Sequence, residues 1–212
     1  EDTHNLVRDL GLPVPSQRMI YNERAAVRAA RSIGYPVVVK PLNANHGRGV
    51  SINLSSDEQV ASAFAFAREH GSSRAVLVES FVEGFDHRML VVNNELVAVA
   101  KRVPGHVVGD GKSTVTELVD KVNEDPRRGI GHEKVLTRLE LDRPAFELLE
   151  LAGLDADSVL PEGEIFYLRN TANLSTGGTA IDLTDVVHPD NREMAVRAIR
   201  AVGLDVGGVD FL

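Results

Sequence analysis

Short β-branched runs alternate with helical patterns along most of this chain, and this alternation limits the fold more than any other feature. The run VVVK at 37–40 is typical of a buried strand, and it follows a helical pattern that starts after Asn22 and ends at Gly34. Two apolar runs flank Asn93-Asn94, which predicts a β-hairpin because asparagine tolerates positive φ. We therefore expect an α+β fold with antiparallel hairpins, since nothing in the pattern forces a parallel strand order.

Capping and turn residues place the other elements. Ser56 with Gln59, and Thr114 with Glu117, have the spacing of capping boxes that open helices. The expected helices cover 3–10, 23–33, 57–70, 115–123, 144–152 and 189–203, and the expected strands cover 37–40, 50–54, 75–79, 88–92, 95–101, 165–169 and the apolar end of the chain. The polar stretch NEDPRRGIGHEK, at 123–134, predicts either a long functional loop or a mobile insertion.

Composition excludes several classes of function. The 212 residues carry 23 Lys and Arg against 31 Asp and Glu, a net charge of −8, so we expect no nucleic-acid partner. The absence of cysteine excludes disulfides, thiolate metal sites and cysteine nucleophiles. No apolar run is long enough to span a bilayer, so we expect no membrane partner and a cytoplasmic protein. The chain lacks an initiating Met and stops in an apolar strand, which predicts a fold truncated at both ends.

Two segments carry residues suited to nucleotide chemistry. Lys40 ends a hydrophobic strand before the glycine-containing loop NANHGRG, where an ammonium and loop amides could hold phosphate oxygens. In VESFVEGFDHR, Glu79 ends a strand, the next residues offer main-chain groups to a flat heterocycle, and Asp86 is placed for a sugar diol. Taken alone, each segment fits a solvated strand end or turn better than a binding site.

The order of these segments resembles the ATP-grasp ligases over essentially the whole chain. This resemblance implies two α+β lobes with the nucleotide cleft between them, a first lobe at 1–80 with the glycine-rich phosphate loop and an incomplete second lobe at 81–212 with a long insertion at about 105–162. It also implies that Lys40 contacts the α- and β-phosphates, that Glu79 meets the adenine amine and that Asp86 holds the ribose hydroxyls. The other implied ATP-binding residues are His46, Gly47, Arg48 and Gly49 in the phosphate loop, the main chain of Ser80 and Val82 at the adenine edge, and Lys101.

A finer resemblance connects five blocks of the chain with the ATP-grasp domain of the cyanophycin synthetase family. The blocks are KPLNANHGRGV, VESFVEGFDHRMLVV, ELVAVAKRVPGHVVGDGKSTVTELVD, NEDPRRGIGHE and YLRNTANLSTGGTAIDLTD. The resemblance implies a ligase that uses ATP to activate the C-terminal carboxylate of a poly-aspartate backbone as an acyl phosphate and then adds L-aspartate. The implied partners are aspartate, a cyanophycin primer and further copies of the same chain in a homo-oligomer.

Two alternatives remain open. The NLSTGG loop also resembles the ATP-grasp module of bifunctional glutathione-synthesising enzymes. The chain could instead be a catalytically incomplete nucleotide-binding fragment, inactive by itself although its parent protein is a ligase.

Acyl phosphate formation brings two anions together, so it needs cations and fixed hydrogen-bond donors. Arg88 and Arg169 are the candidate catalytic cations, and Arg169 is also a candidate for binding the substrate carboxylate. The other candidate substrate-binding residues are Asn173, Ser175, Thr176, Gly177 and Gly178, which otherwise form only a turn. Asp210 matches the first Mg²⁺-binding acid of the family, and its partner ligands are expected after Leu212.

Overall fold

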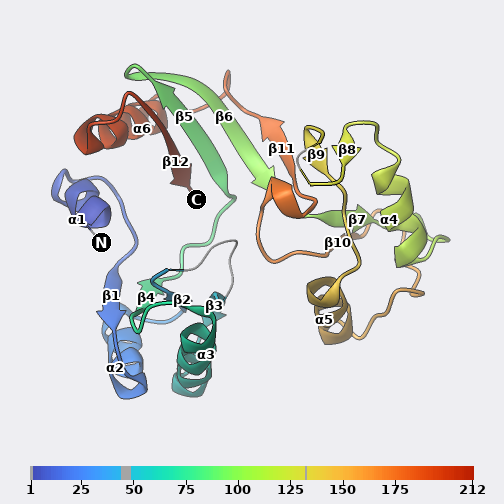
Figure 1. Ribbon diagram of the computed structural model, residues 1–212, viewed down its shortest axis with the longest axis horizontal. Helices are drawn as coiled ribbons and strands as arrows, with labels where there is room; N and C mark the ends of the chain where they lie inside the picture. The colour runs from blue at the N-terminus through green and yellow to red at the C-terminus, as the bar shows by residue number, and fades with distance from the viewer. Residues whose placement is uncertain (1, 44–48, 132) are drawn as a thin grey trace. The chain divides into compact units, whose positions relative to one another are not determined.

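The computed structural model describes residues 2–43, 49–131 and 133–212 (Figure 1). The chain divides into two compact units, Glu1–Gly84 and Phe85–Leu212. Each unit combines helices with an antiparallel four-stranded sheet, which confirms the expected α+β class. Among the described residues, no helix is long and apolar enough to cross a membrane.

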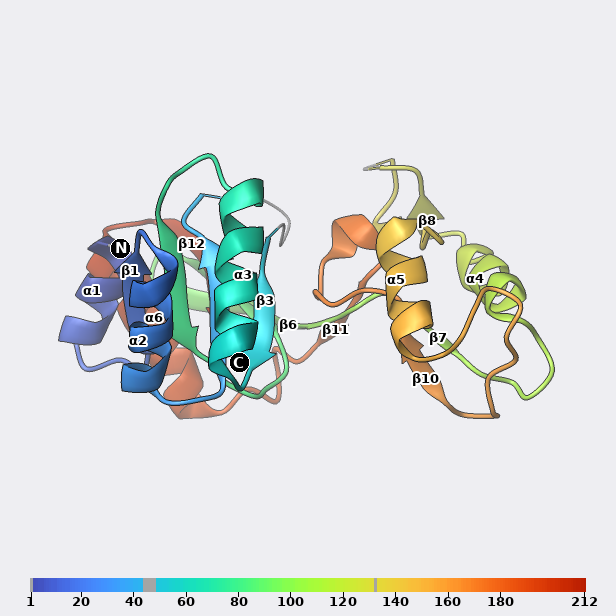
Figure 2. The same ribbon diagram turned by 90° about the horizontal axis from the view of Figure 1, so that it is seen from below.

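The first unit is a four-stranded sheet with two helices side by side against one face (Figures 1 and 2). The strand order is β1-β4-β2-β3, and every neighbouring pair is antiparallel. Alanines and valines from both helices and the central strands form the core, which excludes water from one face of the sheet. The elements are α1 (Asp2–Asp9), β1 (Gln17–Ile20), α2 (Glu23–Ile33), β2 (Val37–Pro41), β3 (Ser51–Leu54), α3 (Asp57–His70) and β4 (Val76–Ser80).

Local signals fix the ends of α2 as the sequence predicts. The side chain of Asn22 accepts a hydrogen bond from the Ala25 N–H, and Gly34 ends the helix at φ +96°, a conformation that other residues rarely adopt. The helix turns its small residues Ala26 and Ala30 into the core, so it lies close to the sheet. This close packing fixes strand β2, which begins three residues after Gly34 and ends with Lys40 and Pro41.

The second unit contains a second sheet, in the order β11-β6-β5-β12, with α6 packed against it. Asn93 and Asn94 have φ values of +49° and +64°, so they form the predicted two-residue turn between β5 and β6. A separate core joins α4 and α5 to the small β7–β10 sheet. The elements are β5 (His87–Val92), β6 (Glu95–Val103), β7 (His106–Val108), α4 (Val115–Asn123), β8 (Arg128–Gly129), β9 (Leu136–Thr137), α5 (Arg143–Leu151), β10 (Ile165–Tyr167), the 3₁₀ turn η1 (Leu174–Thr176), β11 (Thr179–Asp182), α6 (Pro189–Val202) and β12 (Val206–Phe211).

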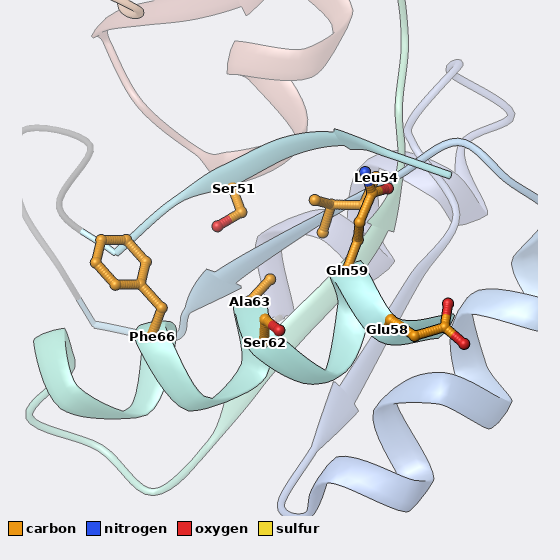
Figure 3. Close-up of a pocket in the computed structure, with 7 residues that line it drawn as sticks. All are labelled: Ser51, Leu54, Glu58, Gln59, Ser62, Ala63 and Phe66. Atoms are coloured by element: carbon orange, nitrogen blue, oxygen red, sulfur yellow. The ribbon is translucent and has the colours of Figure 1, made fainter. Parts of the chain in front are cut away.

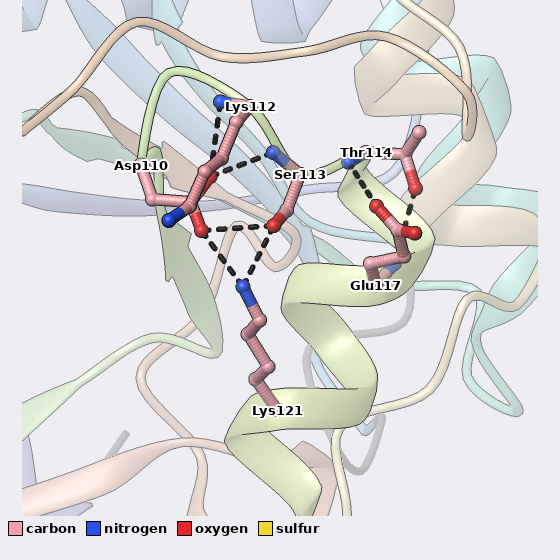
Figure 4. A network of polar contacts seen from close by, with 6 residues as sticks. All are labelled: Asp110, Lys112, Ser113, Thr114, Glu117 and Lys121. Carbon is pink, nitrogen blue, oxygen red and sulfur yellow. Dashed lines mark hydrogen bonds and ion pairs between the residues drawn. The ribbon is translucent and has the colours of Figure 1, made fainter.

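The two capping predictions have different outcomes. Thr114 and Glu117 form the complete reciprocal capping box at α4 (Figure 4). At α3, Ser56 accepts a bond from the Gln59 N–H, but the Gln59 side chain bonds to the N–H of Ser55. The second half of that box is therefore displaced by one residue, although the helix still begins where the sequence predicts.

The structure adds elements that the sequence patterns do not indicate. Strands β1, β7 and β11 are three or four residues long and were not expected. The polar stretch at 123–134 contains β8, which pairs in parallel with β9, so this part of the chain is hydrogen-bonded rather than a bare loop. These short strands complete the sheet edges close to several candidate site residues.

Candidate functional site

Lys40 and Glu79 form an ion pair across two neighbouring strands of the first unit. Lys40 lies opposite Leu77 in the β2–β4 register, and Glu79 is two residues further along β4, so both side chains leave the same face of the sheet. The Lys40 Nζ is 2.7 Å from Glu79 Oε2, with the side chains 35% and 13% exposed. The ammonium group retains further N–H donors, so the pair orients Lys40 without using up its capacity to hold an anion.

Ser80 and Val82, at and after the end of β4, differ in the main-chain groups that they leave free for a planar ligand. The Ser80 N–H donates to the Ser16 carbonyl at 2.9 Å, and the Ser16 N–H donates to the Ser80 hydroxyl at 3.0 Å. Of its two main-chain groups, Ser80 therefore has only the carbonyl to offer. Val82 is exposed, and within the described part of the chain its N–H and carbonyl have no hydrogen-bond partner.

The predicted phosphate loop is only partly described. His46, Gly47 and Arg48 lie outside the described residues. Gly49 has φ +71°, and a Cβ placed on it would lie 2.8 Å from the Cβ of His70 and 3.1 Å from Pro41 Cγ. The end of the loop is thus packed against the last turn of α3 and the residue after Lys40, where only glycine fits.

In the second unit, Asp86, Arg88, Arg102 and Asp210 form one group of alternating charges, which we call the acid–arginine cluster. The Arg102 Nε and Nη2 contact Asp86 Oδ1 at 2.7 and 2.6 Å, and Arg102 Nη2 reaches Asp210 Oδ1 at 3.0 Å. Arg88 Nε contacts the same Asp210 oxygen at 2.9 Å. The cluster therefore joins the predicted ribose acid, Asp86, to the predicted metal acid, Asp210, through Arg102.

Strand register explains why these side chains meet. Arg88 on β5 lies directly opposite Asp210 on β12 and Ala100 on β6, so the three share one face of the sheet. Arg102 is two residues beyond Ala100 and leaves the same face, whereas Lys101 leaves the other face. The Arg102 N–H also donates to the Asp86 carbonyl at 2.7 Å, which fixes the end of β6 next to Asp86.

Two neighbours complete the surroundings of the cluster. A Cβ on Gly208 would lie 2.6 Å from Arg88 Nη1, so the absent side chain leaves room for the guanidinium over β12. The Nζ of Lys101 lies 3.4 Å from the centre of the Phe85 ring, a cation–π contact. The structure therefore places Lys101 outside the acid–arginine cluster, and its role at a nucleotide stays a prediction.

Carboxylate oxygens are suitable ligands for Mg²⁺, and Asp210 offers one such group. Its Oδ1 already accepts from two arginines, and the side chain is 56% exposed. Across the described ranges, no three Asp, Glu or His side chains come together as a metal site. The described residues thus fit a single protein ligand for a metal, which is consistent with the preference of Mg²⁺ for water and phosphate oxygens.

Arg169 is buried rather than free at the surface. Its side chain is 9% exposed, and Nη1 pairs with Asp142 Oδ1 at 3.0 Å. The guanidinium also donates to the carbonyls of Leu168 and Glu140, at 2.8 and 3.1 Å. These contacts occupy three of its N–H groups, so within the described ranges its Nε–H and one Nη2–H remain for a substrate anion.

Residues 173–178, which we call the glycine loop, are held mainly by bonds within the loop. Asn173 Oδ1 accepts from the N–H and the hydroxyl of Ser175, at 3.1 and 2.9 Å. The Thr176 hydroxyl and the Gly178 N–H both donate to the Asn173 carbonyl, at 3.1 and 3.0 Å. Gly177 has φ +91° and ends the 3₁₀ turn η1. The loop is a preformed turn, and these bonds already use part of the donor set expected for a substrate.

Sequence reasoning missed two arginines that the structure places beside predicted site residues. Arg102 joins Asp86 to Asp210, and Arg128 donates to the Gly177 carbonyl at 3.0 Å. For Arg102 the only signal is its place next to Lys101 at the end of a hairpin strand. Arg128 lies in the polar stretch at 123–134, where the double arginine of DPRRG is the available signal.

The first unit also carries a surface hollow. Helix α3 and strand β3 line it with Ser51, Leu54, Glu58, Gln59, Ser62, Ala63 and Phe66 (Figure 3). None of the predicted site residues that the structure describes in the first unit is among these lining residues. The described lining contains the acid Glu58 and no cation, and this does not favour a phosphate group.

Comparison with known proteins identifies the family. Residues 1–136 match the family described as "Carbamoyl-phosphate synthase L chain, ATP binding domain". The chain is 49% identical over 213 residues to a cyanophycin synthetase of Synechocystis sp., and the match covers 100% of this chain and 24% of that protein. It is 35% identical to the glutathione biosynthesis bifunctional protein GshAB of Clostridium perfringens, covering 99% of this chain and 27% of that protein.

A solved structure agrees with these relatives. The bifunctional glutathione synthetase from Pasteurella multocida has 34% identity and a TM-score of 0.66, over 98% of this chain and 28% of that protein. The chain spans about a quarter of the length of the curated relatives it matches. With the family match over more than half of its residues, the chain belongs to the carbamoyl-phosphate synthase L chain ATP-binding family and has the ATP-grasp fold.

Proposed function

We propose that this chain is the part of a cyanophycin-synthesising enzyme that forms the backbone peptide bond. In this reaction ATP converts the C-terminal carboxylate of the poly-aspartate primer into an acyl phosphate, and the amine of L-aspartate displaces the phosphate. The observation that carries the proposal is the identity of 49% with a cyanophycin synthetase over the full length of the chain, against 35% with the glutathione enzyme.

The first unit supplies contacts to the base and phosphates of ATP. Lys40 contacts the α- and β-phosphates, and its ion pair with Glu79 at 2.7 Å holds the ammonium in place for that task. Glu79 accepts from the adenine amine together with the Ser80 carbonyl, while the Val82 N–H donates to the adenine ring. The loop 46–49 covers the phosphates with its main-chain amides and Arg48.

The second unit supplies the ribose and anion contacts. Asp86 holds the ribose hydroxyls, and its contact with Arg102 through Oδ1 leaves Oδ2 for that purpose. Lys101 completes the ATP contacts. Arg88 faces the transferred phosphoryl group from the acid–arginine cluster, where its charge would offset the charge that develops during transfer.

The carboxylate substrate is held by Arg169 and the glycine loop. The free Nε–H and Nη2–H of Arg169 bind a carboxylate or acyl phosphate oxygen, and the fixed contact with Asp142 orients them. Small donors from Asn173, Ser175, Thr176, Gly177 and Gly178 surround the same anion. When the phosphate and the carboxylate are both held in fixed positions, amide formation becomes a reaction between bound partners and no longer needs an encounter in solution.

Magnesium is the metal we propose for Asp210, because the ligand is an oxygen and the substrate brings phosphate oxygens. When bound, the ion would neutralise charge on the terminal phosphates. Asp210 supplies one carboxylate, and Arg88 and Arg102 hold that carboxylate on the sheet. We further propose that the full-length enzyme works in the cytoplasm as a homo-oligomer, without nucleic-acid or membrane partners.

A substrate comparison on the full-length protein tests the proposal. ADP release is measured with Mg²⁺ and ATP in two arms, one with L-aspartate and a cyanophycin primer, the other with glutamylcysteine and glycine. We expect release only in the first arm, together with lengthening of the primer by mass spectrometry. Release only in the second arm would assign the glutathione-type reaction, and release in neither would support a nucleotide-binding module without ligase activity.

A further inference from the structure

Arg128 is a buried cation that forms no ion pair with any acid in the part of the chain that the structure describes. Only 8% of the residue is exposed, and its Nη1 donates to two carbonyls, those of Thr137 at 2.7 Å and Gly177 at 3.0 Å. No carboxylate of the described residues forms an ion pair with it, and the nearby Asp125 is engaged by Arg127 through two nitrogens. Burial lowers the pKa of the Arg128 guanidinium, with Asp125 acting in the opposite direction, but an arginine remains charged at neutral pH.

The chain around Arg128 forms a rigid support. Strands β8 and β9 pair in parallel beside it. The Asn123 side chain exchanges two hydrogen bonds of 2.8 Å with the main chain of Leu139. The Leu139 side chain then packs against Gly105 and Gly177, where an added Cβ would lie 2.6 and 2.8 Å from its Cδ1. The polar stretch and the segment after it therefore form a close-fitting surface beneath the glycine loop.

One peptide plane transmits this support to the loop. The carbonyl of Gly177 and the N–H of Gly178 belong to the same rigid peptide unit. Arg128 holds the carbonyl end, and the Asn173 carbonyl accepts from the N–H end at 3.0 Å. Gly178 is also confined, because a Cβ there would lie 2.6 Å from the Asn173 carbonyl oxygen and 2.8 Å from that of Val103. Fixing this plane fixes the orientation of the residues on both sides of it.

A buried guanidinium is an expensive way to fill such a position. Without a carboxylate partner it loses hydration that two carbonyls replace only in part, and an apolar side chain of similar size often gives equal or greater stability. A positive charge beneath the glycine loop would attract an anion bound on that loop. The attraction is stronger there than in water, because the charge is poorly solvated. The position of Arg128 is therefore better explained by ligand binding than by stability.

We propose that Arg128 is a positioning residue that holds the Gly177–Gly178 peptide in the orientation that receives the anionic group of the carboxylate substrate. The proposal rests on the proposed function for the identity of that substrate, but the fixing of the loop by Arg128 is independent of it. Arg128 acts through the loop and touches no reacting atom. The polar stretch at 123–134 thus acquires a role as the support of the substrate loop.

The test uses the full-length protein with Arg128→Met, Arg128→Lys and the matched control Arg127→Met. Arg127 is the adjacent arginine and is mostly exposed, and among the described residues its side chain pairs with Asp125 alone. The KM values for primer and ATP are measured, together with kcat and amide hydrogen exchange over residues 173–178 and 76–80. Exchange reports on the loop even if the substrate is wrongly assigned.

We expect Arg128→Met to raise the KM for primer or lower kcat on the order of 10- to 100-fold, the scale of a displaced reacting group, with the KM for ATP changed by less than about twofold. Exchange should accelerate in 173–178 and stay unchanged in 76–80. Arg128→Lys should recover part of the loss, because a single nitrogen, Nη1, makes both contacts in the native chain. Arg127→Met should behave as the native protein.

Two results would overturn the proposal. The first is unchanged exchange in 173–178 in Arg128→Met, which would show that the loop does not depend on the arginine. The second is an equal loss of primer use, ATP use and exchange protection in both regions, which would assign Arg128 to general stability. A native protein without activity on the primer would instead refute the proposed function, and the exchange result would still decide the role of Arg128.

Discussion

Replacing Arg102 by methionine tests whether the acid–arginine cluster prepares Asp86 for ribose. The substitution keeps most of the aliphatic packing but removes both contacts to Asp86 and the one to Asp210. A hydrogen bond between charged groups contributes about 1.5 to 3 kcal/mol, and the low end applies because Asp86 is about one-third exposed. The contact with Asp210, 56% exposed, adds less than about 1 kcal/mol.

The free energy of the Arg102–Asp86 contact is therefore the most that holding Asp86 in place can add to nucleotide binding. A contribution of about 1.4 kcal/mol corresponds to a tenfold change in affinity. We expect Arg102→Met to weaken ATP binding about tenfold and to remove most of the preference for ATP over 2′,3′-dideoxy-ATP. The comparison of the two nucleotides matters because losing a cation also weakens attraction to phosphates, and that loss affects both nucleotides equally.

Calorimetric titration of the full-length protein with each nucleotide gives the two affinities directly. Arg143→Met is the matched control, since the Arg143 side chain is 89% exposed and its one ion pair within the described residues is a surface pair with Glu147. If Arg102→Met retains the native ratio between ATP and the dideoxy nucleotide, Asp86 is not prepared by Arg102 and the ribose assignment loses its structural support. Equal losses in both variants would lead to the same conclusion.

Three further predictions concern separate parts of the chain. Lys40→Ala should weaken ATP binding by about 1.5 to 3 kcal/mol in the same titration, whereas Lys112→Ala, at an exposed position, should leave it unchanged. Similar ATP affinities of the two variants would contradict the assignment of Lys40 to the phosphates. Bonds from Lys121 and Ser113 hold the pKa of the Asp110 carboxyl well below its usual range (Figure 4), so its stabilising effect is present above pH of about 4 and is lost as the pH falls toward the folded pKa. The native protein should accordingly have a higher thermal unfolding temperature than Asp110→Asn at neutral pH, and this difference should shrink below pH of about 4. A difference that stays constant with pH would contradict the stabilising role of the Asp110 carboxylate. Asn93→Ile should destabilise the second unit by about 1 to 2 kcal/mol because of its φ of +49°, while Asn93→Gly should not, as measured by urea unfolding.

Elements with their own local signals could be predicted from the sequence. Asn22 and Gly34 define both ends of α2, and Asn93-Asn94 defines the β5–β6 turn, because each residue satisfies a backbone requirement at its own position. Strands β1 and β11 lie at the edges of their sheets and carry no clear alternation. They form through main-chain hydrogen bonds to a neighbour, which depend little on side-chain identity, so sequence patterns do not reveal them.

The candidate site divides in the same way. Lys40 and Glu79 could be located because each lies near the end of a strong apolar strand, and the structure brings their side chains into contact. Arg169 was expected as an anion-binding side chain, yet its burial and its contacts with Asp142 and Glu140 depend on a segment almost thirty residues earlier in the chain. Such a contact between distant segments is fixed by tertiary packing, which a single sequence does not encode in a readable pattern.

The choice of Arg102 over Lys101 shows how small the deciding feature can be. Pairing that continues outward from the turn, with Val92 opposite Glu95 and Val91 opposite Leu96, would place Arg88 opposite Val99 and hence on the face of Lys101. The register shifts by one residue between Leu90 and Val91, so Arg88 instead lies opposite Ala100. Because a shift of one residue exchanges the two faces of a strand, Arg102 rather than Lys101 reaches Asp86 and Asp210. The bulge in the hairpin thus selects which of two adjacent cations joins the predicted ribose and metal acids.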